Sequence, residues 1–366
     1  MSRKKVGPSL YFASDKVIFD ALNHRAVKTD VLRDLLFERG VIVSSKTSKF
    51  DLAHYFSRLT TDYFDQRNIG LKLGRTARNE RMTFSEVKEP LDAEHVRNAL
   101  LSVKASLEQQ HCQVDLQQSE NGRLLATVSY EYVDYTEVEF RQVQPRDLVV
   151  EFVPDEHGGY VVRSTKNQFA DAIVDEVFGE LKKTYGKEIP RGAVSLEGMA
   201  DPALRTKFFE SLMHGIPGHA FVTVTEAFCF KPKVAASIKV EEDGEDEDED
   251  DLEKQPYVER VSLKGSGVNK TFVIDELYAK GYYIIKVVWR VKPTKSLDSD
   301  VFELEAQFSD PASCTGFSYQ TRTAYVFEDG KLTDKKRAPK REEEDALFRL
   351  IEAAATAAID SLGALE

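Results

Sequence analysis

Three residues in the first quarter of the chain have the types that a metal-dependent nuclease uses. Asp65 is followed by Glu86-Val87-Lys88, an acid and a lysine separated by one residue. In such a site a pair of carboxylates holds Mg²⁺, and the lysine stabilises the negative charge that develops at the scissile phosphate. The stretch that carries the last two, 82–88, has few apolar side chains and is predicted to be a surface strand. A nuclease that uses Asp65, Glu86 and Lys88 is therefore one alternative.

Two other groups of residues lack the partners that their chemistry requires. His214 and His219 flank a Gly-Ile-Pro-Gly turn ahead of Cys229, whereas a zinc site needs three or four ligands at compatible spacing. The run Gly265–Thr271 precedes a predicted helix but lacks two of the anchoring glycines of a phosphate-binding loop. We predict ordinary turns at both places, and we assign no catalytic residue, metal or cofactor.

Glu303 and Glu305 have the spacing of a carboxylate pair on one strand. They alternate with apolar residues such as Phe302, Leu304 and Phe308. Because successive side chains of a strand point to opposite faces of a sheet, the two acids share the face away from the core. We therefore expect them on the outer side of a half-buried strand, without a catalytic role.

The segment 28–59 contains two predicted short helices joined by an extended piece. The first carries Val31-Leu32-Arg33-Asp34-Leu35-Leu36 and ends at Glu38-Arg39-Gly40-Val41, while Ser45-Lys46-Thr47-Ser48-Lys49 leads into the second. Ser48, with Asp51 three residues later, is a capping pair for the second helix. These motifs cover about a tenth of the chain and resemble a SAP-type or helix-extension-helix module, with Ser45 near the position of the family's usual glycine.

The resemblance implies a function in DNA binding. Modules of this type use cations at the start of the second helix, which here are Lys46 and Lys49, with Arg33 and Arg39 as further candidates. Amide groups at a helix N-terminus and nearby lysines can hold a phosphate. The alternative is a small helical packing unit with an ordinary charged surface.

A second group of cations follows this module. Five basic residues accompany one acid and two glycines over 67–81, which predicts a flexible positive strap within a linker, 67–90. The strap would add charge to the same nucleic-acid surface. A further basic run, 335–341, is interpreted as a nucleic-acid patch, a nuclear localisation signal or a solvated loop. The cations of the strap are Arg67, Lys72, Arg75, Arg78 and Arg81.

The rest of the chain has one pattern twice. Predicted helices at 92–109 and 167–183 enclose strands at 111–118, 123–133, 136–142, 146–153 and 159–164. Helices at 271–280 and 342–362 enclose strands at 281–291, 300–309 and 316–328. This order indicates an α+β fold, with a small N-terminal helical module followed by two helix–antiparallel-sheet–helix units. The predicted domains are a helical SAP-like module (1–66), a basic linker (67–90), an α+β domain (91–235), an acidic disordered insert (236–256) and an α+β unit with a C-terminal helix (257–366).

The net charge of -12 comes almost entirely from one segment. Between Glu241 and Glu253 lie eleven acidic residues and no basic one, so the remaining chain is nearly neutral. Residues 1–90 carry 17 basic and 11 acidic residues. The acidic composition therefore does not exclude a nucleic-acid partner. The acidic run has too few apolar residues to fold, and it would compete with phosphate for basic surfaces, as an electrostatic brake on non-specific binding.

Together these features favour a non-enzymatic protein that binds nucleic acid, DNA in the first place, through the helical module and strap. The α+β body would bind a protein partner or self-associate. A partner-binding subunit of an intracellular complex, without nucleic-acid contact, is a further alternative. Three scattered cysteines are typical of reduced thiols, and no apolar stretch reaches the ~20 residues of a membrane helix. We expect a cytoplasmic protein without a secretory signal, or a nuclear one in a eukaryotic cell.

Overall fold

The computed structural model describes residues 13–73, 80–155, 158–232, 258–268, 272–295 and 298–363. The acidic insert predicted over 236–256 lies outside these residues. The chain divides into a helical unit, formed by 1–79, 100–117 and 126–149, and a sheet unit, formed by 80–99, 118–125 and 150–366. Helices and a large antiparallel sheet make the chain α+β, as predicted. None of the helices among the described residues is long and apolar enough to cross a membrane.

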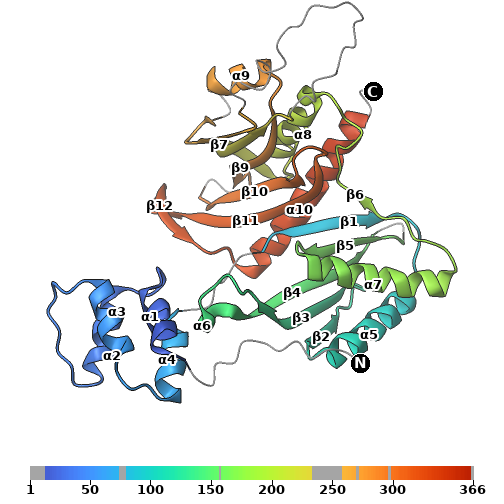
Figure 1. The fold of residues 1–366 in the computed structure, drawn as a ribbon. Coiled ribbons are helices and arrows are strands. Elements are labelled where there is room, and N and C mark those ends of the chain that lie inside the picture. The colour runs from blue at the N-terminus through green and yellow to red at the C-terminus, as the bar shows by residue number, and fades with distance from the viewer. Residues whose placement is uncertain are drawn as a thin grey trace, which may run out of the picture. The chain divides into compact units, whose positions relative to one another are not determined.

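The helical unit is built around α1 (Asp15–Asn23), α2 (Thr29–Phe37), α3 (Lys49–Ser57) and α4 (Tyr63–Leu73) (Figure 1). Leu32 and Leu36 of α2 and Phe56 of α3 are buried in its core. The Ser48 hydroxyl caps α3, because it accepts a hydrogen bond from the Asp51 amide at 3.1 Å and donates one to the Asp51 carboxylate at 2.6 Å. The predicted capping pair is thus confirmed.

The predicted flexible strap is wrong over its first part. Residues 67–73 are the second half of α4, in which Ile69 and Leu73 are buried. Their four-residue spacing places both side chains on one face of a helix. These two apolar residues anchor α4 in the core of the helical unit, although the sequence around them is mostly polar. Residues 74–79 lie outside the described ranges.

The next elements along the chain are α5 (Ala93–Gln109), β2 (Gln113–Gln118), β3 (Leu124–Val133) and β4 (Val143–Pro154). Their residues are divided between the two units. The three strands are neighbours in the order β2, β3, β4. The strand predicted over 136–142 is wrong, because Glu139–Gln142 forms the short helix α6. The reason is a polar turn before it. The Asp134 carboxylate accepts hydrogen bonds from the Thr136 amide at 3.0 Å and from its hydroxyl at 2.6 Å, and such turns interrupt a strand.

The sheet unit contains an antiparallel sheet in which β1 lies between β5 and β11. The strand predicted over 82–88 is present as β1, but its predicted position at the surface is wrong, since Met82, Phe84 and Val87 are buried. The basic run 335–341 is partly a strand, because it contains the end of β12. The strand order is β5 (Tyr160–Thr165), β1 (Met82–Val87), β11 (Thr315–Glu328), β10 (Val301–Asp310), β9 (Tyr283–Pro293), β7 (His219–Phe230) and β8 (Arg260–Lys264), with β6 (Gly192–Ala193) beside β1 and β12 (Lys331–Arg337) beside β11.

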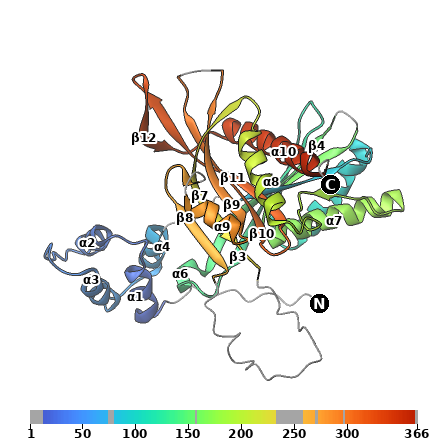
Figure 2. The ribbon, with the colours of Figure 1, turned by 90° about the horizontal axis from the view of Figure 1, so that it is seen from above.

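Helices pack on both faces of this sheet, but in different places (Figures 1 and 2). α7 (Gln168–Tyr185) covers one face of β5. The Phe178 ring of α7 stacks on Phe152 of β4, which pairs in register with Val162 of β5. α8 (Pro202–His214) and α10 (Arg341–Gly363) lie together on the opposite face, against β9 and β11, and α9 (Phe272–Ala279) adds Ile274 to that core. The face of β9, β10 and β11 away from α8 and α10 is rich in charged side chains.

A buried ion-pair cluster connects α10 to the sheet. The Arg163 guanidinium donates to both carboxylate oxygens of Glu352 at 2.5 and 2.6 Å, and to Glu151 at 2.6 Å. The Tyr319 hydroxyl also donates to Glu352, and Arg123 pairs with Glu151. Burial would lower the pKa of Arg163, but the hydrogen bonds and the charge of Glu352 raise it, and the net shift of this pKa is upward. The two buried carboxylates are therefore matched by two arginines.

Candidate nucleic-acid interface

Four cations of the helical unit lie on two segments, the loop after α1 and the residues at the start of α3. The Lys49 ammonium donates a 2.7 Å hydrogen bond to the His24 carbonyl, which joins the loop that carries Arg25 and Lys28 to the segment that carries Lys46. Partial burial lowers the pKa of Lys49. Arg25, Lys28 and Lys46 are exposed and form no ion pair among the described residues. We call Arg25, Lys28, Lys46 and Lys49 the basic edge.

Two of the predicted phosphate-binding arginines are held by bonds within the helical unit. Arg33 pairs with Asp30 at 2.8 Å and donates to the Ser45 carbonyl at 2.6 Å. Arg39 pairs with Asp65 and lies over the Phe56 ring at 4.8 Å. Both arginines thus join helices and loops of the unit.

The five cations of the predicted strap are not brought into one group by the described structure. Lys72 is exposed on α4, and Arg67 lies on the same helix. Arg75 and Arg78 lie outside the described residues. Arg81, in the sheet unit, donates to the buried Glu305 carboxylate at 2.7 Å.

Exposed aromatic rings accompany the cations of the helical unit. Phe50 follows Lys49 directly, and 57% of its side chain is exposed. Its ring is stacked with that of His54 and meets Phe19 edge-on. Tyr63 and Phe64 form a second exposed pair at the start of α4. Sequence reasoning missed these rings, although Phe50 is an aromatic residue beside a predicted phosphate-binding lysine.

Asp65, Glu86 and Lys88, the three residues of the nuclease alternative, have the following surroundings. Partial burial would raise the pKa of Asp65, but the Asp62 amide and the Arg39 guanidinium lower it. Glu86 accepts a 2.7 Å hydrogen bond from the Thr356 hydroxyl of α10, and Lys88 is exposed. Among the described residues no group of three His, Cys, Asp or Glu side chains is placed to hold a metal ion.

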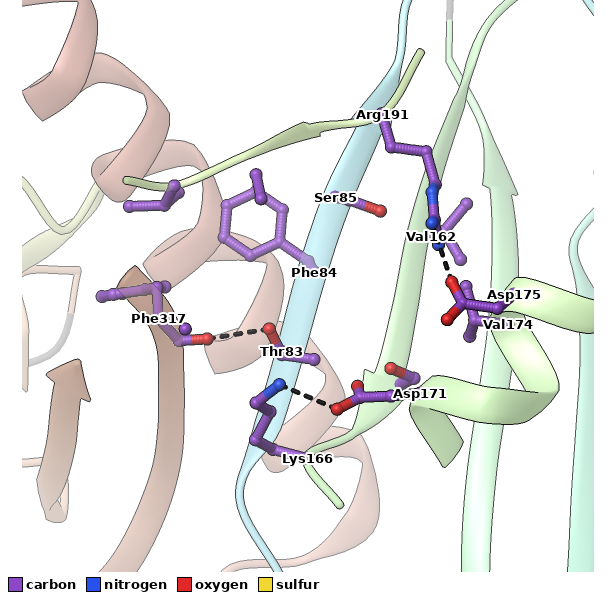
Figure 3. Close-up of a pocket in the computed structure, with 14 residues that line it drawn as sticks. Thr83, Phe84, Ser85, Val162, Lys166, Asp171, Val174, Asp175, Arg191 and Phe317 are labelled. Atoms are coloured by element: carbon purple, nitrogen blue, oxygen red, sulfur yellow. Dashed lines mark hydrogen bonds and ion pairs between the residues drawn. The ribbon is translucent and has the colours of Figure 1, made fainter. Parts of the chain in front are cut away.

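A cavity of about 380 Å³ lies beside β1, β5 and the first half of α7 (Figure 3). Lys166 pairs with Asp171 at 3.0 Å, and Arg191 pairs with Asp175 at 2.8 Å, so its charges are balanced. The Thr83 hydroxyl donates to the Phe317 carbonyl at 2.7 Å. This cavity has no excess charge with which to attract an ion.

The expectation that Glu303 and Glu305 face solvent is wrong. They do lie opposite the apolar side of β10, but both are buried, and Glu305 is only 1% exposed. Burial would raise the pKa of Glu305, yet Arg81 at 2.6 Å and Lys286 at 3.1 Å outweigh it and lower that pKa. The alternation in the sequence assigned the correct face but did not identify the cations that cover it.

No protein-family model matches the chain, and no curated protein matches its sequence.

Proposed function

We propose that this protein binds nucleic acid, DNA in the first place, through the basic edge of the helical unit. The observation that supports this most is the group of three exposed cations, Arg25, Lys28 and Lys46, with no ion-pair partner among the described residues. Such cations are available to displace counterions from phosphates, and this release supplies most of the affinity of non-specific binding. Of the four cations that the SAP resemblance indicates, the proposal keeps Lys46 and Lys49. It adds Arg25 and Lys28 to them.

The exposed Phe50 ring adds a second kind of contact to this proposal. Aromatic side chains next to a positive surface stack on unpaired bases, and each stacked base contributes ~1–3 kcal/mol. A duplex keeps its bases stacked, so Phe50 would contribute to single strands only. Binding to duplex and single-stranded forms of one sequence therefore separates the two contributions.

The test compares two triple variants of equal net charge. Arg25→Gln/Lys28→Gln/Lys46→Gln removes the three unpaired cations of the basic edge. Lys207→Gln/Lys280→Gln/Lys331→Gln removes three exposed cations of the sheet unit. We expect the first to weaken duplex binding about 10- to 100-fold and to lower the salt slope by about 2–3, and the second to change neither. Equal effects of the two variants would contradict the proposal.

The acidic run 241–253 enters this proposal as an electrostatic brake. Its eleven carboxylates would compete with phosphate for the basic edge, most strongly at low salt where screening is weak. We expect deletion of 241–253 to raise DNA affinity at low salt and to have little effect at high salt. A neutral replacement of the same length controls for the deletion, and an unchanged affinity in both variants excludes the brake.

The exposed pair Tyr63 and Phe64 supports a second candidate function, binding of a protein partner or a second copy of this chain. Exposed aromatic rings are typical anchors of protein interfaces. Tyr63→Ser/Phe64→Ser is expected to abolish self-association measured by sedimentation velocity while leaving DNA binding unchanged. A protein that sediments as a monomer at every concentration argues against self-association.

A further inference from the structure

The second cavity of the sheet unit lies on the charged face of the sheet, opposite α8 and α10, and has a volume of about 480 Å³. Residues of β7, β8, β9, β10, β11 and β12 line it together. On a flat sheet β8 and β12 would be separated by five strand spacings, or about 24 Å. The sheet therefore curls around this cavity and makes the charged face concave.

Cations outnumber carboxylates in this cavity. Its charged lining residues are Lys264, Arg290, Arg322 and Lys336 on the positive side, and Glu226 and Glu303 on the negative side. The cavity in Figure 3 instead contains equal numbers of both signs. A concave surface with an excess of positive charge concentrates anions from solution.

The two carboxylates hold the cations in place. Glu226 accepts from Lys264 at 2.8 Å and from Arg322 at 3.4 Å. Glu303 accepts from Arg290 at 3.2 Å. Burial would raise the pKa of Glu226, but Lys264 and Arg322 lower it, so the carboxylate remains ionised. Lys264, Arg290 and Arg322 are therefore held in place before a ligand arrives, which reduces the entropy lost on binding.

Arg322 is held from two directions. Its Nε atom lies 3.4 Å from the buried Glu305, while its Nη1 atom contacts Glu226. About a third of its side chain is nevertheless exposed, and Lys264 is 78% exposed at the rim of the cavity. These two cations can therefore contact a ligand without losing their carboxylate partners.

Two of the cations contact the ring of Tyr325. The Arg290 guanidinium is 3.9 Å from the centre of its ring, and the Lys336 ammonium is 5.2 Å from it. These contacts hold both cations beside the ring. Lys336 forms no ion pair among the residues that the structure describes.

We propose that this cavity is a binding site for an oligophosphate chain, such as tripolyphosphate or the phosphates of a nucleoside triphosphate. A chain of phosphates carries several charges along its length, which matches cations contributed by four strands. Arginine side chains fit pairs of phosphate oxygens, and lysines serve as point charges. Ser266 and Thr323 also line the cavity. This site belongs to the sheet unit and is independent of the basic edge.

The experiment titrates the full chain with tripolyphosphate, ATP and inorganic phosphate by calorimetry. The variant is Lys264→Gln/Lys336→Gln, and the control is Lys207→Gln/Lys331→Gln, which removes two exposed lysines outside the cavity. We expect the wild type and the control to bind tripolyphosphate equally, and the variant to bind it about 10-fold or more weakly. All four lysines are at the surface, and unchanged thermal unfolding without ligand verifies that each protein is folded.

Three outcomes would overturn the proposal: no binding of tripolyphosphate by the wild type at millimolar concentration, equal losses in variant and control, or inorganic phosphate bound as tightly as tripolyphosphate. Two outcomes support it and differ in the ligand that they identify. Equal affinity for tripolyphosphate and ATP means that the phosphate chain is sufficient. A higher affinity for ATP that is also lost in Lys264→Gln/Lys336→Gln identifies a nucleotide.

Discussion

The helical unit and the charged face of the sheet unit both contain many cations, but they hold them differently. On the sheet face Arg81, Lys286 and Arg322 converge on the single buried carboxylate of Glu305. At the basic edge Arg25 and Lys28 have no ion-pair partner among the described residues. The number of cations in a segment therefore says little about how many are free to bind a ligand.

The difference follows from burial. A carboxylate inside a sheet must be paired, because an isolated buried charge is very costly, and its partners become part of the fold. A lysine on a loop remains hydrated and needs no partner. Substitution of a buried carboxylate or of the cation that pairs with it should therefore change stability. Substitution of an exposed, unpaired lysine should instead change binding.

The largest effect is expected for Arg163→Met. This change leaves Glu352 without its two hydrogen bonds from arginine in a buried site, and we expect a loss of about 3–5 kcal/mol in the free energy of unfolding, measured by urea denaturation. Adding Glu352→Gln should restore part of the loss, since the unpaired charge is removed. A loss no greater than that of an exposed lysine variant would contradict the inference that the cation of a buried carboxylate is part of the fold.

A smaller and pH-dependent effect is expected for Glu305→Gln. The folded-state pKa of Glu305 is lowered, so its contribution to stability is present above the unfolded value of about 4.3 and is lost as the pH falls through the folded value. At pH 7 we expect a cost of about 1–3 kcal/mol, since three cations lose a charged partner. Unfolding of wild type and variant between pH 7 and pH 3 should show this cost decreasing. The exposed Glu197→Gln is the control, and a cost independent of pH would contradict the assignment.

The smallest effects are expected for two cations of the helical unit. Arg39→Gln loses the pair with Asp65 and the hydrogen bond to the Thr60 carbonyl, so we expect about 1 kcal/mol lower stability and little direct change in DNA affinity. Lys46→Gln should leave stability within about 0.5 kcal/mol and weaken DNA binding severalfold. Thermal unfolding and a salt-titrated binding assay on both variants check this, and the reverse pattern would show that the two residues have been assigned the wrong roles.

Local signals were sufficient for most helices and strands. Ser48 with Asp51 marked a helix start that the structure confirms. The alternation along β10 assigned Phe302 and Leu304 to the core face and the glutamates to the other. These features depend on residues near one another in the sequence, so they can be predicted from it.

Features that depend on distant segments were not predictable. β1 has an alternating polar face because Thr83 and Ser85 line the cavity in Figure 3, and only its pairing with β5 and β11 makes it an interior strand. The burial of Glu305 depends on a cation contributed by Arg81, 224 positions away. The two segments of the basic edge are likewise joined by a contact of Lys49 with a carbonyl 25 residues earlier.

The position of β1 between β5 and β11 also has a consequence for how the chain acquires its structure. During synthesis β1 can pair with β5 and then with β6, whereas its edge at Met82 stays open until Tyr319 has been made. Contacts of such long sequence separation are slow to form, and an unpaired strand edge can pair with another chain in the meantime. We therefore expect the closing of this edge by β11 to be a slow step in the folding of the sheet unit, and the interval before it to be the one in which the nascent chain most needs protection from aggregation.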